Sequence, residues 1–268
     1  MSPGRLANKV AMSPPNASPL CFMTPTHVGD LRPFTILRHS IEAFAPGIPH
    51  IAIVNTEDYG EFHERFHHCA NFQLVKTCEV LPGQIERRRR NSSSKWLRGP
   101  WPRQRLIRGW HARQLMKLFA LADCPYPAAA FVDSDIFIHR PLGSDSFFRD
   151  GRLKLFRRRA VNAERLDFDI STHEILGNPL HQVTELFDYI FSPACFRKST
   201  ALSLFAALEA RRRSRWVRRF LAQQRPSECN LLGYAATVLE GGADYEIIES
   251  SQDDLGAFTA ATGYNMAC

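Results

Sequence analysis

Residues 128–137 read AAAFVDSDIF, and this stretch decides the fold. The five apolar residues 128–132 predict a strand buried on both faces, as the central strands of parallel sheets are. Asp133 and Asp135 follow at its carboxyl end, where open α/β sheets bind their ligands. Two like charges this close repel, so the pair points to a shared divalent cation, with a solvated turn as the alternative. Mn²⁺ or Mg²⁺ suits such a site, because these ions combine one or two carboxylates with phosphate oxygens and water.

Strands and helices alternate on both sides of this stretch. Strands are predicted over 20–23 (LCFM), 50–54 (HIAIV) and 72–80. Helices are predicted from about Asp30 to the Pro46-Gly47 stop, and over 58–69, 112–122, 181–188, 199–210 and 228–239. This order favours an α/β fold with a mostly parallel central sheet flanked by helices.

Composition divides the chain into one domain and two tails. The chain has 268 residues, of which 44% are hydrophobic, and this length suffices to bury a core. Residues 1–19 are rich in Pro, Ser and Asn and are expected to form a flexible tail. Residues 20–250 are predicted to form the domain, with a mobile basic loop at 84–109, and residues 251–268 a second tail.

Several classes of protein are disfavoured by the sequence. No apolar run is long enough for a transmembrane helix, and the first twenty residues lack the apolar core of a secretory signal. The seven cysteines are scattered and form no C-x-x-C pair, which favours a reducing, cytoplasmic location. The phosphate-binding, dinucleotide-binding and serine-hydrolase glycine motifs do not occur.

Four segments carry a resemblance to known enzymes. FVDSDIF at 131–137 resembles the D-x-D motif of nucleotide-sugar-dependent glycosyltransferases with the A-type fold. LCFMTPTHVGDLRPFTILRHSIEAF at 20–44 resembles the first strand and helix of that fold. GWHARQLMKLFALA at 109–122 and PSECNLLGYAA at 226–236 are similar to segments of an uncharacterised bacterial family of proposed glycosyltransferases. The resemblance covers roughly residues 20–250 and implies an A-type, Rossmann-like domain.

The resemblance also implies roles for particular residues. Asp135 would bind the metal that bridges the donor diphosphate, and Asp133 would contact the ribose or a metal-bound water. The other residues expected to contact the nucleotide sugar are Thr24, Pro25, Thr26, Gln114, Lys117 and Ser134. Of these, Lys117, or alternatively Arg113, would pair with phosphate, unless each belongs only to the polar face of its helix. A third metal ligand is left open, because no histidine follows His181.

Glu228 has two readings. Ser227 is expected to cap a helix that begins there, and a glutamate in a first helical turn is favoured by the helix dipole alone. In the functional reading, its carboxylate contacts the sugar or acts as the base that deprotonates the acceptor.

The implied reaction is transfer of a sugar from a nucleoside diphosphate sugar to a glycan or lipid-linked acceptor. Six arginines within Arg211–Arg219 suggest peripheral contact with an anionic membrane at its inner face, and no specific nucleic acid is expected as a partner. A polyanion- or membrane-surface-binding protein without catalysis is one alternative. A haloacid-dehalogenase-like phosphohydrolase is another, although its Asp-x-Asp motif normally follows the first strand.

A zinc hydrolase is the remaining alternative. His63-Glu64-Arg65-Phe66-His67 matches H-E-x-x-H, which on a helix places two imidazoles on one face. Arg65 stands where such buried helices carry an apolar residue. Glu86 would be the nearest candidate for a third ligand.

Overall fold

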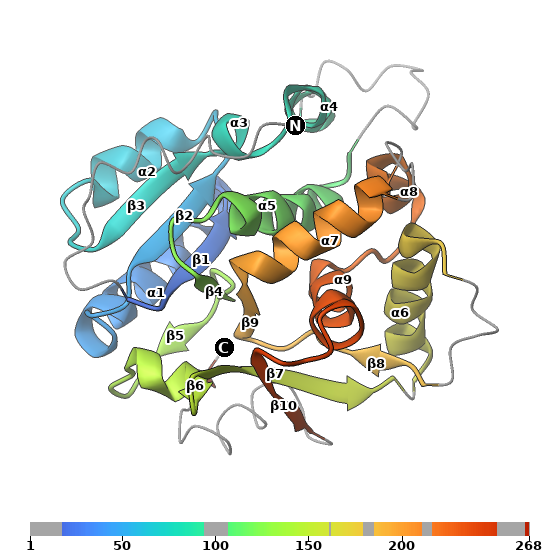
Figure 1. Ribbon diagram of the computed structural model, residues 1–268. Helices are drawn as coiled ribbons and strands as arrows, with labels where there is room; N and C mark the ends of the chain where they lie inside the picture. The colour runs from blue at the N-terminus through green and yellow to red at the C-terminus, as the bar shows by residue number, and fades with distance from the viewer. Residues whose placement is uncertain are drawn as a thin grey trace.

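A five-stranded sheet crosses the molecule, with helices packed on both of its faces (Figure 1). The computed structural model describes residues 18–93, 107–160, 162–178, 185–210, 216–250 and 266–267. The strand order is β3-β2-β1-β4-β9. The strands are β1 (Leu20–Thr26), β2 (His50–Val54), β3 (Phe72–Lys76), β4 (Ala128–Phe131) and β9 (Ala194–Arg197). The first four run parallel and only β9 is antiparallel, which confirms the predicted mostly parallel sheet.

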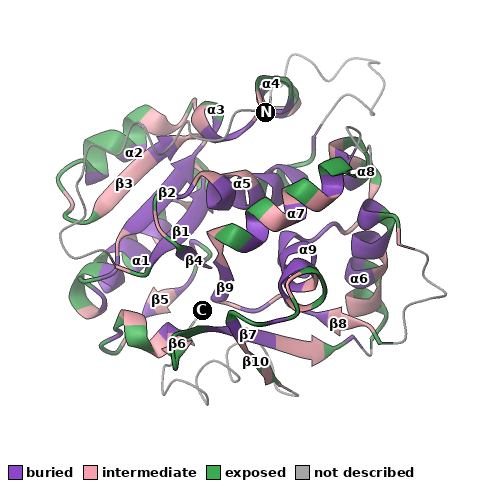
Figure 2. Ribbon diagram, in the orientation of Figure 1, coloured by how far each residue is buried: buried purple, intermediate pink, exposed green. Residues whose placement is uncertain are grey.

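The central strands are apolar throughout because helices cover both sides of them. Every residue of β1, β2 and β4 is buried, as Figure 2 shows for the centre of the sheet. On one face Phe34 packs against His50, with ring centroids 5.6 Å apart. On the other face Met23 and Ile51 line a small space together with Ala120. Alternation along the strands therefore separates two apolar layers.

The helices divide between these layers. α1 (Leu31–Phe44) and α2 (Tyr59–Phe66) share the face of Phe34, and α5 (Gly109–Asp123) packs against α7 (Lys198–Ala210) on the other. The described part of the chain also contains η1 (Val28–Asp30), α3 (Thr77–Val80), α4 (Gly83–Ser93), η4 (Ser144–Phe147), α6 (Ala163–Leu176), α8 (Trp216–Ala222), α9 (Glu228–Tyr234) and the π-helix η6 (Ala235–Leu239).

A second, smaller sheet lies beyond β9. Its long strand β7 (Arg152–Arg159) runs parallel to β10 (Tyr245–Glu249) and antiparallel to β6 (Phe148–Arg149) and β8 (Phe187–Asp188). A two-residue pairing joins β5 (Phe137–Ile138) to β11 (Met266–Ala267). α6 and α9 both pack against β8, and the backbone N–H of Tyr189, which follows β8, donates to Asn230 of α9 at 2.9 Å.

Three local predictions were wrong. The predicted strand 72–80 ends at Lys76, because Glu79 accepts a hydrogen bond from the Lys76 backbone and starts a helical turn. The predicted loop 84–109 contains α4 and the start of α5, while residues 94–106 lie outside the described part. The predicted helix 181–188 ends in strand β8, and residues 181–184 are likewise not described.

The tails predicted at the two ends fall mostly outside the described residues. Residues 1–17 and 251–265 are not described. Within the arginine block, residues 211–215 are not described either. The helices predicted over 199–210 and 228–239 are confirmed, the second as α9 continued by η6.

Candidate functional site

The carboxyl ends of the central strands open into a cavity of about 210 Å³. The Asp133-Ser134-Asp135 turn follows β4 and lines the cavity. Residues from the N-terminal parts of α5 and α9 complete the lining. Six of the residues expected at the site line this cavity together: Gln114, Lys117, Asp133, Ser134, Asp135 and Glu228. Residues far apart in the sequence therefore meet at one place.

Lys117 joins two carboxylates at the bottom of this cavity. Its ammonium lies 3.1 Å from a Glu228 oxygen and 3.3 Å from Oδ1 of Asp133, and its side chain is only 10% exposed. Burial disfavours its charged form, but the two carboxylates outweigh that effect and raise the pKa of Lys117 above its ordinary value. In return, the charge of Lys117 lowers the pKa of Asp133. Lys117 and Asp133 are therefore both charged at neutral pH.

Glu228 occupies the first turn of α9, as its capping sequence predicts. The Ser227 hydroxyl accepts a hydrogen bond from the backbone of Asn230 at 3.1 Å, which confirms the expected cap. The side-chain amide nitrogen of Gln114 donates to both carboxylate oxygens of Glu228, lying 3.2 Å from Oε1. Glu228 is 2% exposed, so its carboxylate is reached only through the cavity.

Asp133 and Asp135 differ from Glu228 in exposure. The Asp133 side chain is 52% exposed, and Asp135 is exposed as well. Among the described residues no ion pair or hydrogen bond to the Asp135 carboxylate is present. Both carboxylates therefore have oxygens available to a ligand at the cavity wall.

The chemistry of these side chains fits a hydrated divalent cation. Within the described residues no three His, Cys, Asp or Glu side chains gather as a closed metal site. Two exposed carboxylates suffice for Mg²⁺ or Mn²⁺ when phosphate oxygens and water complete the coordination. The cavity holds four carboxylates against the cations of Arg113 and Lys117, an excess of two negative charges.

Asp30 is a further residue of this cavity, for which the sequence predicts only the start of a helix. Its carboxylate accepts from Arg113 at 3.0 Å and from the Ser134 hydroxyl at 3.1 Å, and it lies 2.9 Å from Nδ1 of His27. It thereby connects the end of β1 to the D-x-D turn and to α5. Its place directly after a strand-end loop was the signal in the sequence.

A larger cavity of about 630 Å³ adjoins the first and shares Trp110 and Arg113 with it. Pro25 and Thr26 line it at the end of β1. The Thr26 hydroxyl is buried and has no hydrogen-bond partner among the described residues, so it is available to a ligand. Thr24 does not line this cavity, because its hydroxyl is bonded to His50 at 3.0 Å inside the sheet.

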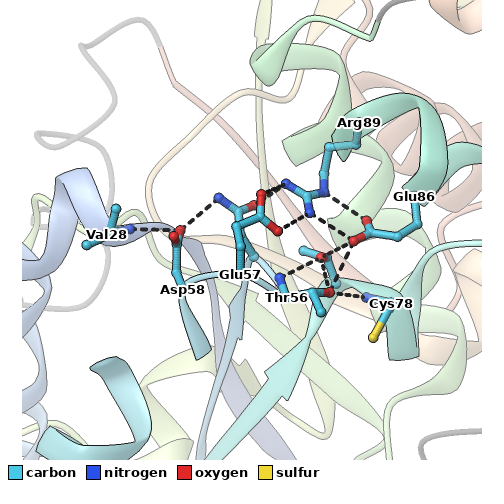
Figure 3. A network of polar contacts seen from close by, with 9 residues as sticks. Val28, Thr56, Glu57, Asp58, Cys78, Glu86 and Arg89 are labelled. Atoms are coloured by element: carbon cyan, nitrogen blue, oxygen red, sulfur yellow. Dashed lines mark hydrogen bonds and ion pairs between the residues drawn. The ribbon is translucent and has the colours of Figure 1, made fainter. Parts of the chain in front are cut away.

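One wall of the larger cavity is fixed by a buried polar network (Figure 3). Arg89 of α4 donates to both oxygens of Glu57 at 2.7 and 3.0 Å, and to both oxygens of Glu86 at 2.8 Å. It also donates to Asn55, which follows β2 and lines the cavity. Burial alone would raise the pKa of Glu86, but Arg89 outweighs it and lowers that pKa.

The H-E-x-x-H segment lies on the exposed surface of α2. The rings of His63 and His67 stack with centroids 5.4 Å apart. Glu86, the expected third ligand, is engaged instead with Thr56, Thr77 and Arg89.

The Asp-x-Asp turn follows the fourth strand of the chain, unlike the first-strand position of the dehalogenase motif. No helix in the described part of the chain is long and apolar enough to cross a membrane.

Comparison with solved structures identifies related folds at low sequence identity. Core-mannan synthase A from Aspergillus fumigatus, in its Mn/GDP form, is 10% identical with a TM-score of 0.50, covering 98% of this chain and 86% of that one. Mouse xyloside xylosyltransferase 1 in its apo form is 8% identical with a TM-score of 0.39, covering 85% and 84%. Staphylococcus aureus TarS is 11% identical with a TM-score of 0.36, covering 69% of this chain and 29% of that one. The fold shared with core-mannan synthase A is the glycosyltransferase A-type fold that the sequence resemblance implied.

Comparison by sequence gives a different kind of result. No curated protein matches the chain. A protein family described as a family of unknown function, DUF6492, matches residues 18–242. This range includes all the residues that line the two cavities. The chain therefore belongs to the family of unknown function DUF6492.

Proposed function

We propose that this protein transfers a sugar from a nucleoside diphosphate sugar to a glycan or lipid-linked acceptor. The observation that carries the proposal is the pairing of Asp133 and Asp135 at the end of β4, in a cavity that adjoins a larger one at the end of β1. The nucleoside would occupy the larger cavity, and the sugar would lie against Lys117 and Glu228. A core-mannan synthase in a Mn/GDP form with this fold supports the assignment.

The charge of the smaller cavity supports metal-dependent donor binding. The excess of carboxylates repels a diphosphate, and Asp135 and Asp133 would hold a divalent cation that removes this repulsion. When bound, such a cation neutralises the charge that develops on the leaving diphosphate. Arg113 is 44% exposed beside Asp30 and is placed to attract the phosphates as a second cation.

The remaining residues of the cavity would hold the sugar. Glu228 lies beside the Lys117 ammonium, and its carboxyl oxygens are acceptors for a sugar hydroxyl. Thr26 offers its unpaired hydroxyl to the ribose or the base. The Ser134 hydroxyl donates to Asp30 and thereby holds the turn that carries Asp133 and Asp135.

Thermal unfolding with nucleoside diphosphates tests this proposal. Each of UDP, GDP, ADP and CDP is added with Mn²⁺, with Mg²⁺ or with EDTA. A ligand at a hundred times its dissociation constant adds about 2.7 kcal/mol, which for this size of domain raises Tm on the order of 5–10 °C. We expect one diphosphate to produce this shift only in the presence of the metal.

Asp135→Asn should abolish the metal-dependent shift and leave the Tm of the free protein unchanged, because Asp135 is exposed. Asp167→Asn is the matched control, since Asp167 is exposed on α6 away from both cavities. Equal metal-dependent shifts in Asp135→Asn and the wild type would contradict the assigned metal ligand. Stabilisation by Zn²⁺ alone, lost in His63→Ala, would favour the hydrolase reading instead.

A further inference from the structure

Trp110 is a large apolar side chain left open to solvent beside the charged cavity. It is the second residue of α5 and is 46% exposed. It lines both the 210 Å³ cavity and the 630 Å³ cavity, so it stands where the two meet. The exposed part of the indole is therefore open to a ligand that occupies either cavity.

The indole is held in place from two sides. Its N–H donates to the Pro226 carbonyl at 3.2 Å. The Phe168 ring lies against it with centroids 6.2 Å apart, and the Arg225 guanidinium lies over Phe168 at 5.6 Å. The only polar atom of the indole is thus already bonded, and what the ring presents to a ligand is carbon surface.

The groups around Trp110 complement one kind of ligand. Pro226, which accepts the indole N–H, lies two residues before Glu228, so the ring is tied to the segment that carries this carboxylate. Asp133 and Asp135 share the same cavity, and Phe191 forms apolar wall on it. A pyranose ring has hydroxyls around its edge and C–H bonds on its faces. Carboxylates accept from the hydroxyls while an aromatic face covers the C–H bonds.

We infer that Trp110 is a stacking platform for a pyranose ring at the junction of the two cavities. This inference rests on the proposed function and adds a specificity-determining residue to it. The ring belongs either to the donor or to the acceptor, and both sources offer the same chemistry to the indole. A nucleobase stacked on Trp110 is the competing arrangement.

The test compares Trp110→Ala and Trp110→Phe with the wild type. Calorimetry with Mn²⁺ measures UDP against UDP-glucose and GDP against GDP-mannose, which reports on the donor ring. Saturation-transfer NMR with methyl glucoside, methyl galactoside and methyl mannoside reports on the acceptor ring. It is recorded without nucleotide and again with the nucleoside diphosphate that binds best. Trp110→Phe retains the aromatic face and loses only the bond to Pro226, so it separates stacking from support of the fold.

In Trp110→Ala we expect roughly tenfold weaker binding of a nucleotide sugar or loss of the saccharide signal, with binding of the nucleoside diphosphate unchanged. Trp110→Phe should retain most of the sugar binding. Equal weakening of UDP and UDP-glucose would show base stacking and overturn the inference. Unchanged sugar binding in Trp110→Ala would also overturn it. The same holds if the wild type gives no saccharide signal and binds each nucleotide sugar no more tightly than the corresponding nucleoside diphosphate. Failure of all nucleotides to bind, with a saccharide signal that depends on Trp110, would contradict the proposed donor while supporting the platform.

Discussion

At the scale of single residues, Lys117 is the side chain on which the site depends most. It is the shared counter-charge of buried Glu228 and half-exposed Asp133. We predict that Lys117→Met lowers the free energy of unfolding by about 3–5 kcal/mol, because removing one partner of a buried ion pair leaves an uncompensated charge. Urea unfolding measures this loss.

The partners of Lys117 provide internal controls for that prediction. Glu228→Gln should destabilise the protein less than Lys117→Met does, because Lys117 retains Asp133 as a partner. The double variant Lys117→Met/Glu228→Gln should recover part of the loss, since no buried charge then remains unpaired. A loss below about 1 kcal/mol in Lys117→Met would mean that water reaches Glu228 more freely than its burial indicates.

At the scale of elements, α4 shows how far local sequence determines structure. Arg89 is 4% exposed and joins this helix to Glu57 on the β2–α2 connection (Figure 3). We predict that Arg89→Met destabilises the protein by about 3–5 kcal/mol, and that Arg89→Lys loses part of this because it cannot bond both carboxylates bidentately. Unfolding in urea and proteolysis within α4 measure the effect.

Arg88→Met is the matched control for this helix. Arg88 is the exposed neighbour of Arg89, so its replacement should change the free energy of unfolding by no more than about 0.5 kcal/mol. If Arg88→Met and Arg89→Met were equally stable, the arginine run would act only as a solvated surface. In that case the buried network would contribute nothing to α4.

The Asp133–Asp135 turn could be predicted from the sequence, whereas α4, α6 and the role of Trp110 could not. The apolar strand before Asp133 and Asp135 is a local signal, and it predicted their position at the end of β4. α4 was predicted as a loop, because its buried residues Glu86 and Arg89 have partners elsewhere in the chain, Thr77 for Glu86 and Glu57 for Arg89. α6 was missed because its buried face mixes apolar residues with Asp169 and His173, which blurs the helical pattern. The placement of Trp110 could likewise not be predicted, because it depends on a hydrogen bond to Pro226, which is distant in the sequence.

At the scale of the whole molecule, the second sheet and α6 enclose a buried acidic pair behind the cavity wall. Asp188 of β8 is fully buried and is paired with Arg158 and Arg165. Asp169 of α6 is 5% exposed, with one carboxylate oxygen lying 3.8 Å from His173. Burial and then the charge of Asp188 raise the pKa of Asp169 to about 7.

This raised pKa predicts how stability depends on pH. The folded protein keeps Asp169 protonated up to about pH 7, whereas an unfolded aspartate loses its proton near pH 4. The contribution of Asp169 is therefore fully present below pH 4 and is lost as pH rises towards 7. Asp169→Asn cannot ionise, so its free energy of unfolding relative to the wild type should increase over this interval. The increase should be a few kcal/mol, since one pKa unit corresponds to about 1.4 kcal/mol.

Urea unfolding at intervals between pH 4.5 and pH 8 measures this difference directly. Asp167→Asn, on the exposed side of the same helix, should run parallel to the wild type across the whole range. His173, whose pKa is lowered by burial, is present in all three proteins, so differences between them report chiefly on Asp169 and its coupling to Asp188. Parallel curves for the wild type and Asp169→Asn would show that Asp169 ionises normally. The acidic pair would then be solvated, and the packing of α6 on β8 would be looser than the buried contacts require.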